Sequence, residues 1–189
     1  MESLDLDIMV KPKNNGIGVL GGSFDPPHKG HLKVSLISLR NLKLNKILWV
    51  LTKKNPFKKK PLFSLKERIK ACKKITKNYK KIEIQYLDDK VKSSNSIKII
   101  NYIKNRNKKS NIYFLIGSDG LLNFHKWTSW KKILNLCTLI VFSRKGFDKK
   151  AKKSVIVRYL KNNNIIFVKN KKIDISSTAL KSAYQKSKF

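Results

Sequence analysis

The sequence predicts an α/β fold with one doubly wound parallel sheet and helices on both of its faces. Short apolar runs alternate with helical patterns along the chain, and these runs are apolar on both sides of the strand. Strands of this kind need helices above and below them, and alternation with helices places successive strands in parallel. The 189 residues suit a single domain with a full-sized core.

Each expected element follows from its own pattern. Ser64 and Glu67 have the spacing of a capping box, so the second helix begins there, and Leu32, Leu36 and Leu39 share one face of the first helix. Predicted strands and helices alternate along the chain, as in Rossmann-like folds, and the sequence has no internal repeats. The predicted strands are 17–22, 47–52, 82–86, 112–117, 138–143 and 165–168; the predicted helices are 29–41, 64–77, 96–106, 127–136, 149–160 and 176–186.

Composition bounds the class of protein. No apolar run approaches the length of a membrane span, and Cys72 and Cys137 stand alone, so we expect a soluble protein of the reducing cytoplasm without a membrane partner. Residues 1–15 lack the pattern of a secretory signal and are expected to form a flexible N-terminal extension. Residues 16–189 form the expected domain.

The net charge of +33 suggests a basic nucleic-acid-binding module as an alternative. That module would carry a basic stripe interleaved with aromatic side chains. Here lysines are scattered over nearly every segment and only five residues are arginine, the usual residue for reading bases. Lysine, asparagine and isoleucine are abundant together, as in an AT-rich genome. We therefore expect no specific nucleic-acid partner.

Residues 21–31, GGSFDPPHKGH, carry the strongest functional signal. A buried strand runs into two glycines, a proline-bent turn follows, and a helix begins at once. Glycines let a ligand approach the backbone, and a helix N-terminus favours anions. His28 and His31 are three residues apart, so both rings can reach one small volume above that terminus. The pattern predicts phosphate chemistry.

Other interpretations of these histidines are weaker. Two histidines at this spacing can simply lie on a surface or cap a helix. A zinc site lacks further ligands, because His125 is the only other histidine and the cysteines form no Cys-x-x-Cys pair. The glycine spacing matches neither a P-loop nor a dinucleotide-binding fingerprint.

These residues resemble the His-x-Gly-His signature of the nucleotidylyltransferase superfamily. Residues 175–181, ISSTALK, resemble its second motif, Ile-Ser-Ser-Thr-x-x-Arg. Between them, residues 55–58 (NPFK), 117–119 (GSD) and 123–127 (NFHKW) resemble the bacterial nicotinate-nucleotide adenylyltransferases. The resemblance spans residues 17–186. It implies transfer of the adenylyl group of ATP to nicotinate mononucleotide.

The resemblance also assigns roles. His28 and His31 are the expected catalytic residues, donating to the phosphates of ATP, while Trp127 stacks on the nicotinate ring and Ser96 opens a helix below it. Mg²⁺ is expected as a partner of ATP, held mostly by the phosphates and water and not by a carboxylate cage. The expected ATP- and phosphate-binding residues are Gly21, Gly22, Ser23, Phe24, Gly30, Lys58, Asp119, Arg144, Ser176, Ser177, Thr178 and Lys181.

Two positions depart from the family pattern. Lys181 stands where the motif has arginine, and lysine keeps the charge but loses the two-pronged donor geometry. Residues 94–96 read Ser-Asn-Ser where the family usually shows Ser-Tyr-Thr. Pantetheine phosphate and nicotinamide mononucleotide remain alternative acceptors. The oligomeric state stays open, with a homo-oligomer among the alternatives.

Overall fold

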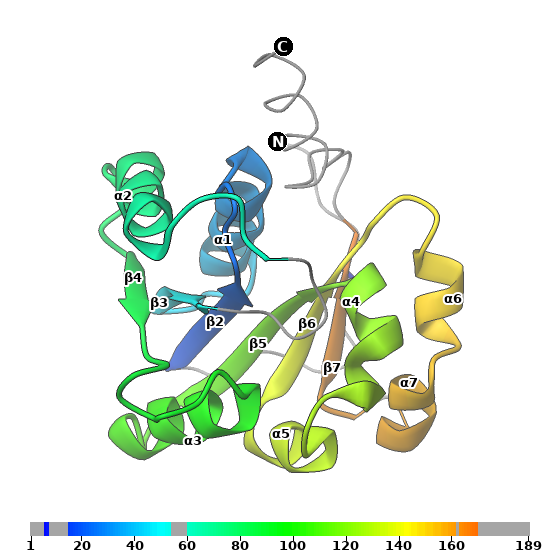
Figure 1. The fold of residues 1–189 in the computed structure, drawn as a ribbon. Helices are drawn as coiled ribbons and strands as arrows, with labels where there is room; N and C mark the ends of the chain where they lie inside the picture. Colours follow the sequence, from blue (N-terminus) through cyan, green and yellow to red (C-terminus); the bar gives the residue numbers. More distant parts are fainter. Residues whose placement is uncertain (1–5, 8–14, 54–59, 162, 170–189) are drawn as a thin grey trace.

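The computed structural model describes residues 6–7, 15–53, 60–161 and 163–169. It contains the predicted parallel sheet, in the order β1-β7-β6-β5-β2-β3-β4 (Figure 1). The six strands from β2 to β7 pair in parallel, and β1 pairs with β7 in the antiparallel direction. The strands are β1 (Leu6–Asp7), β2 (Gly16–Gly22), β3 (Lys46–Leu51), β4 (Ile82–Tyr86), β5 (Asn111–Gly117), β6 (Thr138–Phe142) and β7 (Ile165–Val168).

Helices cover both faces of the sheet. One buried cluster packs the sheet against the first two helices, and includes Trp49 and Cys72; the other packs the opposite face against the remaining helices, and includes Phe114 and Ile133. The helices are α1 (Lys29–Asn41), α2 (Leu65–Thr76), α3 (Ser96–Arg106), α4 (Ser118–Asn123), α5 (Trp130–Leu136), α6 (Asp148–Lys152) and α7 (Val155–Leu160), with a 3₁₀ turn η1 (Phe124–Lys126).

Strand order reverses between β2 and β5. From β2 the chain winds outward through β3 to β4, then crosses to β5 on the other side of β2 and winds outward again. In sheets of this kind ligands bind beyond the carboxyl ends of the strands at the reversal. The fold therefore places a binding region at the end of β2, beside Gly22, and at the end of β5, beside Gly117.

Three local predictions differ from the structure. The predicted helix 127–136 begins at Trp130, so Trp127 lies outside it, directly after η1. The predicted helix 149–160 is divided into α6 and α7, because the chain leaves helical geometry at Ser154 (ψ 160°). The sequence predicts no helix between 106 and 127, but α4 follows β5 directly and holds Asp119 in its first turn.

The ends of the chain bear on two other predictions. Leu6 and Asp7 belong to the expected N-terminal extension, and they pair with Val168 and Phe167 of β7. The predicted helix 176–186 lies outside the described residues. Among the described residues, no helix combines the length and the apolarity needed to cross a membrane.

Candidate active site at the end of β2

The two histidines of the turn fix each other. His28 is the N-cap of α1, and its Nδ1 accepts a hydrogen bond from the backbone N–H of Gly30 at 3.1 Å. In return, the backbone N–H of His28 donates to Nδ1 of His31 at 3.2 Å. This is a capping box in which two imidazoles take the places that Ser and Glu usually occupy. The sequence motif thus sets the orientation of both rings.

These hydrogen bonds also decide which ring nitrogen carries the proton. Nδ1 of each imidazole accepts a backbone N–H, so the proton lies on Nε2 of His28 and of His31. The ring centroids are 3.8 Å apart, with 33° between the ring planes. Two Nε2–H donors on adjacent rings suit a phosphate better than a metal ion, because a metal needs an unprotonated nitrogen.

Aromatic packing supports the pair from below. The ring of Phe24 lies 4.8 Å from that of His31 and stacks on Trp49 at 4.9 Å with 17° between planes. Nε1 of Trp49 donates to Oγ of Ser35 at 2.8 Å, and that hydroxyl donates to the carbonyl of His31 at 2.9 Å. Phe24 has a left-handed backbone conformation (φ +48°) and is 2% exposed. Its ring is therefore buried, and it packs against the ring of His31.

A small cavity of about 60 Å³ lies in front of the histidines. Its walls come from the ends of β2, β5 and β6 and from the start of α1, including Leu20, His28, His31, Gly117 and Arg144. We call it the histidine cavity. The predicted residues His28, Gly30, His31 and Arg144 are therefore brought together.

Asp119 and Arg144 form an ion pair beside this cavity. Oδ1 of Asp119 lies 3.2 Å from Nε of Arg144. The backbone N–H of Arg144 donates to Oγ of Ser118 and to Oδ1 of Asp148, both at 3.0 Å. A Cβ added at Gly117 would overlap the Asp119 carboxylate and lie 2.9 Å from Nε of Arg144, so a side chain here would displace the ion pair. Asp119 and Arg144, two predicted site residues that are far apart in the sequence, thus meet at the end of β5.

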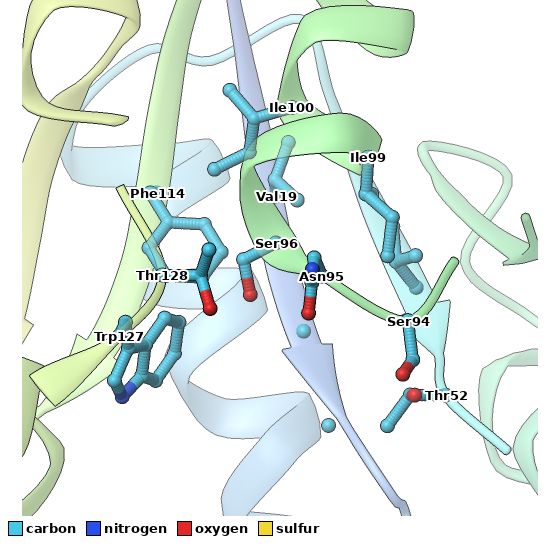
Figure 2. Close-up of a pocket in the computed structure, with 13 residues that line it drawn as sticks. Val19, Thr52, Ser94, Asn95, Ser96, Ile99, Ile100, Phe114, Trp127 and Thr128 are labelled. Atoms are coloured by element: carbon cyan, nitrogen blue, oxygen red, sulfur yellow. The ribbon is translucent and has the colours of Figure 1, made fainter. Parts of the chain in front are cut away.

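A second cavity, of about 210 Å³, opens on the other face of the sheet. Trp127 and Phe114 lie on one side, and the segment from Ser94 to Ser96 lies across from them (Figure 2). The backbone of Gly21 and Gly22 contributes another wall. We call it the tryptophan cavity. Both predicted nicotinate-binding residues, Trp127 and Ser96, line it.

Trp127 presents part of its indole to this cavity. It is half-buried, with its rings 4.9 Å from Phe124 and 5.9 Å from Phe114, the latter edge to face. Ser96 is the first residue of α3, and Asn95, the N-cap, makes no side-chain capping hydrogen bond. A helix N-terminus with its partial positive charge therefore faces an aromatic wall.

Other predicted residues have different places. Gly21 and Gly22, expected to contact ATP phosphates, line the tryptophan cavity, while Ser23 lies just beyond them. His125 is half-buried in η1 and lines neither cavity. Within the described part of the chain, no three His, Cys, Asp or Glu side chains gather as a metal site. Lys58, Ser176, Ser177, Thr178 and Lys181 lie outside the described residues.

The model of the cytidylyltransferase-like family matches residues 19–183. A probable nicotinate-nucleotide adenylyltransferase from Pelagibacter ubique is 45% identical over 179 residues, which are 92% of this chain and 99% of the relative. The chain belongs to the nicotinate-nucleotide adenylyltransferase family. Another probable member, from Aquifex aeolicus, is 34% identical over 85% of this chain and 98% of its own length.

Solved structures show the same fold. The nicotinic acid mononucleotide adenylyltransferase of Plasmodium falciparum, complexed with NaAD, superposes with a TM-score of 0.72 over 89% of this chain and 83% of its own, at 22% identity. A putative nicotinate-nucleotide adenylyltransferase from Vibrio parahaemolyticus gives a TM-score of 0.65 over 92% of this chain and 88% of its own, at 18% identity. The fold of this chain, shown in Figure 1, is thus shared by these solved structures.

Sequence reasoning missed three buried charged residues near the site: Asp25, Arg68 and Asp88. Only Arg68 carries a local signal. It lies four residues before Cys72 and eight before Thr76, on the one face of α2 that is buried, where an arginine is unexpected. The partners of Asp25 and Asp88 are 35 to 38 residues away in sequence, so no local pattern shows them.

Proposed function

We propose that this chain joins nicotinate mononucleotide to the AMP part of ATP, releasing pyrophosphate and forming nicotinate adenine dinucleotide for NAD biosynthesis. One observation carries the proposal. The histidine cavity and the tryptophan cavity lie on opposite faces of the sheet at the same end of β2, with Leu20 lining the first and Gly21 and Gly22 lining the second. A candidate phosphate-binding site and an aromatic site thus flank the end of one strand.

The reaction needs alignment and charge compensation more than covalent chemistry. A phosphate oxygen of the mononucleotide attacks the α-phosphorus of ATP, a new P–O bond forms, and the bond to the bridging oxygen of pyrophosphate breaks. The attacking oxygen is already anionic, so no base has to remove a proton. The Nε2–H groups of His28 and His31 donate to the phosphates as negative charge shifts toward the leaving group.

The tryptophan cavity suits the pyridine ring of the acceptor. The exposed part of Trp127 offers a stacking face, and such stacking is worth roughly 1–3 kcal/mol. The N-terminus of α3 at Ser96 favours a carboxylate over a neutral amide, since its partial charge is positive. This favours the acid, nicotinate mononucleotide, over nicotinamide mononucleotide.

The remaining parts of the site are proposals from the sequence motifs. Lys58 reaches substrate phosphate, and Ser176, Ser177, Thr178 and Lys181 hold the terminal phosphates of ATP. Arg144, paired with Asp119, supplies a further cation beside the histidine cavity. Mg²⁺ arrives with ATP, because Mg²⁺ usually keeps water and binds through substrate phosphates.

We assign the protein to the cytoplasm, in keeping with two free, buried cysteines. Its partners are ATP and nicotinate mononucleotide, without a specific nucleic acid, and self-association into a homo-oligomer is left to measurement. The experiment is an acceptor comparison. Purified protein, ATP and Mg²⁺ are incubated with nicotinate mononucleotide, nicotinamide mononucleotide or pantetheine phosphate, and pyrophosphate release is followed. The acid gives the highest kcat/KM; preference for either other acceptor overturns the assignment.

A further inference from the structure

We propose that Arg68 is a positioning residue of the transfer reaction. Its buried guanidinium holds the ends of β2 and β3 together and thereby aligns the histidine turn with the tryptophan cavity. The inference rests on the proposed function, because it concerns the relative placement of the two substrates. Arg68 itself lines neither cavity.

Arg68 acts where the two strands part. The last ladder bond between them joins the N–H of Thr52 to the carbonyl of Gly22 at 3.1 Å. Nη1 of Arg68 then donates to the carbonyls of Ser23, at 2.6 Å, and of Thr52, at 2.9 Å. One nitrogen thus bridges the first carbonyl after each strand.

The same side chain reaches the start of its own helix. Nε of Arg68 donates to the carbonyl of Phe63 at 3.1 Å. Ser64 and Glu67 form a capping box, with the Ser64 N–H donating to Oε2 of Glu67 at 2.8 Å, so the beginning of α2 is fixed. The fixed start of α2 therefore positions the guanidinium, and the guanidinium in turn fixes the positions of the ends of β2 and β3.

Two buried carboxylates complete the arrangement. Asp25 accepts from the N–H groups of Leu62, at 2.8 Å, and Phe63, at 3.0 Å. Asp88 accepts from Oγ1 of Thr52 at 3.0 Å and from the N–H of Lys53 at 2.8 Å. Asp25 thus adds hydrogen bonds that hold the histidine turn, and Asp88 adds hydrogen bonds that hold the end of β3.

Burial makes this network rigid. Arg68 is 3% exposed, Asp25 2% and Asp88 7%. Burial lowers the pKa of Arg68, and the carboxylates, Asp25 first, oppose that change. Removing one member leaves buried charges and carbonyls without partners, which is costly. The buried hydrogen bonds of Arg68, Asp25 and Asp88 therefore resist a shift of the strand ends.

The strand ends that Arg68 joins lead to both substrates. Thr52 and Gly22 line the tryptophan cavity. Ser23 follows Gly22 and begins the turn to His28. A shift of one strand end against the other moves the acceptor relative to the histidines, and a misplacement of about 1 Å can lower the rate about 10²-fold.

The test replaces Arg68 with methionine, which keeps an unbranched stem without the donors, and with lysine, which keeps the charge on a shorter side chain and lacks the Nε that donates to Phe63. We expect kcat to fall about 10²-fold in Arg68→Met and about tenfold in Arg68→Lys, while the KM of each substrate changes less than about threefold. Each kcat is calculated per binding-competent active site, so that misfolded protein does not lower the measured value.

The matched control is Cys72→Ala. Cys72 is fully buried one turn further along α2 in the cluster that includes Trp49 and Leu51, and its removal takes away packing while the bonds of Arg68 to Ser23 and Thr52 stay in place. Each variant is assayed at the same interval below its melting temperature. The proposal is wrong if Arg68→Lys, or a folded Arg68→Met, keeps kcat within about twofold of Cys72→Ala.

A second measurement needs no turnover. The N–H groups of Thr52 and Lys53 donate to Gly22 and Asp88. Their amide hydrogen exchange speeds up at least about tenfold in the Arg68 variants and not in Cys72→Ala, because only the former release the strand ends. Unchanged exchange overturns the proposal. If wild-type protein transfers no adenylyl group, the proposed function fails, and exchange still decides whether Arg68 holds the strand ends.

Discussion

The backbone N–H of His28 donates to Nδ1 of His31, and the two imidazole rings lie 3.8 Å apart. The hydrogen bond that caps the helix therefore also orients a ring that we propose as catalytic. Because Nδ1 of His28 accepts the N–H of Gly30 in the same way, neither ring can rotate without losing a helix-capping bond. Under the proposed mechanism, local folding and transition-state stabilisation depend on the same atoms.

Replacing either histidine with alanine lowers kcat, by on the order of 10²–10³ for each, because a donor to the developing charge is lost. The KM of ATP rises much less. Steady-state kinetics with a circular dichroism spectrum of each variant measures this. His125→Ala is the control, since His125 lines neither cavity, and its turnover stays near that of the wild type. Normal turnover in folded His28→Ala and His31→Ala rules out the phosphate role.

Trp127→Ala raises the KM of nicotinate mononucleotide roughly tenfold or more while the KM of ATP changes little, since the lost face stacks on the acceptor. Trp127 also packs on Phe124, so the melting temperature falls as well. Trp127→Phe retains much of the activity. Separate titrations of the two substrates check this.

The control for that experiment is Trp130→Ala. Trp130 lies in α5, 4.9 Å from the ring of Tyr159, and lines neither cavity. It loses stability without an acceptor-specific defect. If Trp127→Ala behaves in the same way as Trp130→Ala, Trp127 is a packing residue and not a stacking one.

Gly117→Ala separates Asp119 from Arg144, because the new Cβ occupies the space between them. We expect the KM of ATP to rise about fivefold as Arg144 loses its position. Gly16→Ala, which crowds Leu44 and Tyr113 at the other end of β2, is the matched control and affects stability only. If the KM of ATP is the same in both variants, the Asp119–Arg144 ion pair does not take part in ATP binding.

The sheet was predictable because its information is local. Six strands combine short apolar runs with β-branched residues, and all six lie in the structure at nearly the predicted bounds. Helix α4 was missed because six residues containing Gly120 show no helical period. Trp127 was placed inside a helix because its three-residue spacing from Trp130 looks helical.

The site was predictable only in part, for a similar reason. The histidine turn is a contiguous motif, but its spacing allowed helix capping only as an alternative to phosphate chemistry, whereas in the structure the two imidazoles do cap α1. The bonds of Arg68 to Ser23 and Thr52 join residues 45 and 16 positions away. In a helix with many lysines, a buried arginine resembles one more solvated charge, and only its place on the buried face distinguishes it.

The two cysteines should be unreactive in the native protein. Burial raises the pKa of Cys72 and of Cys137 to about 12, so both thiols stay protonated. Alkylation at pH 8 is slow until the protein unfolds. Since the folded pKa values lie above the ordinary thiol value of 9.0, the contribution of the two thiols to stability is complete below about pH 9 and declines as the pH rises toward 12. Fast labelling of native protein contradicts the burial.

Lys181→Ala should raise the KM of ATP, since the motif places a cation at the terminal phosphates. Lys181→Arg should stay active and bind ATP more tightly, because a guanidinium donates two parallel hydrogen bonds. The KM of ATP in the two variants checks this. An unchanged value in Lys181→Ala removes Lys181 from the triphosphate site.

The most direct test follows the phosphorus atoms of ATP. Protein, Mg²⁺ and nicotinate mononucleotide are incubated with ATP labelled at the α- or the γ-phosphate, and the products are separated. Adenylyl transfer predicts the α label in a dinucleotide and the γ label in pyrophosphate, with both products absent in the His28→Ala, His31→Ala double variant. A γ label in the acceptor or in orthophosphate would show attack at the γ-phosphorus and contradict the account.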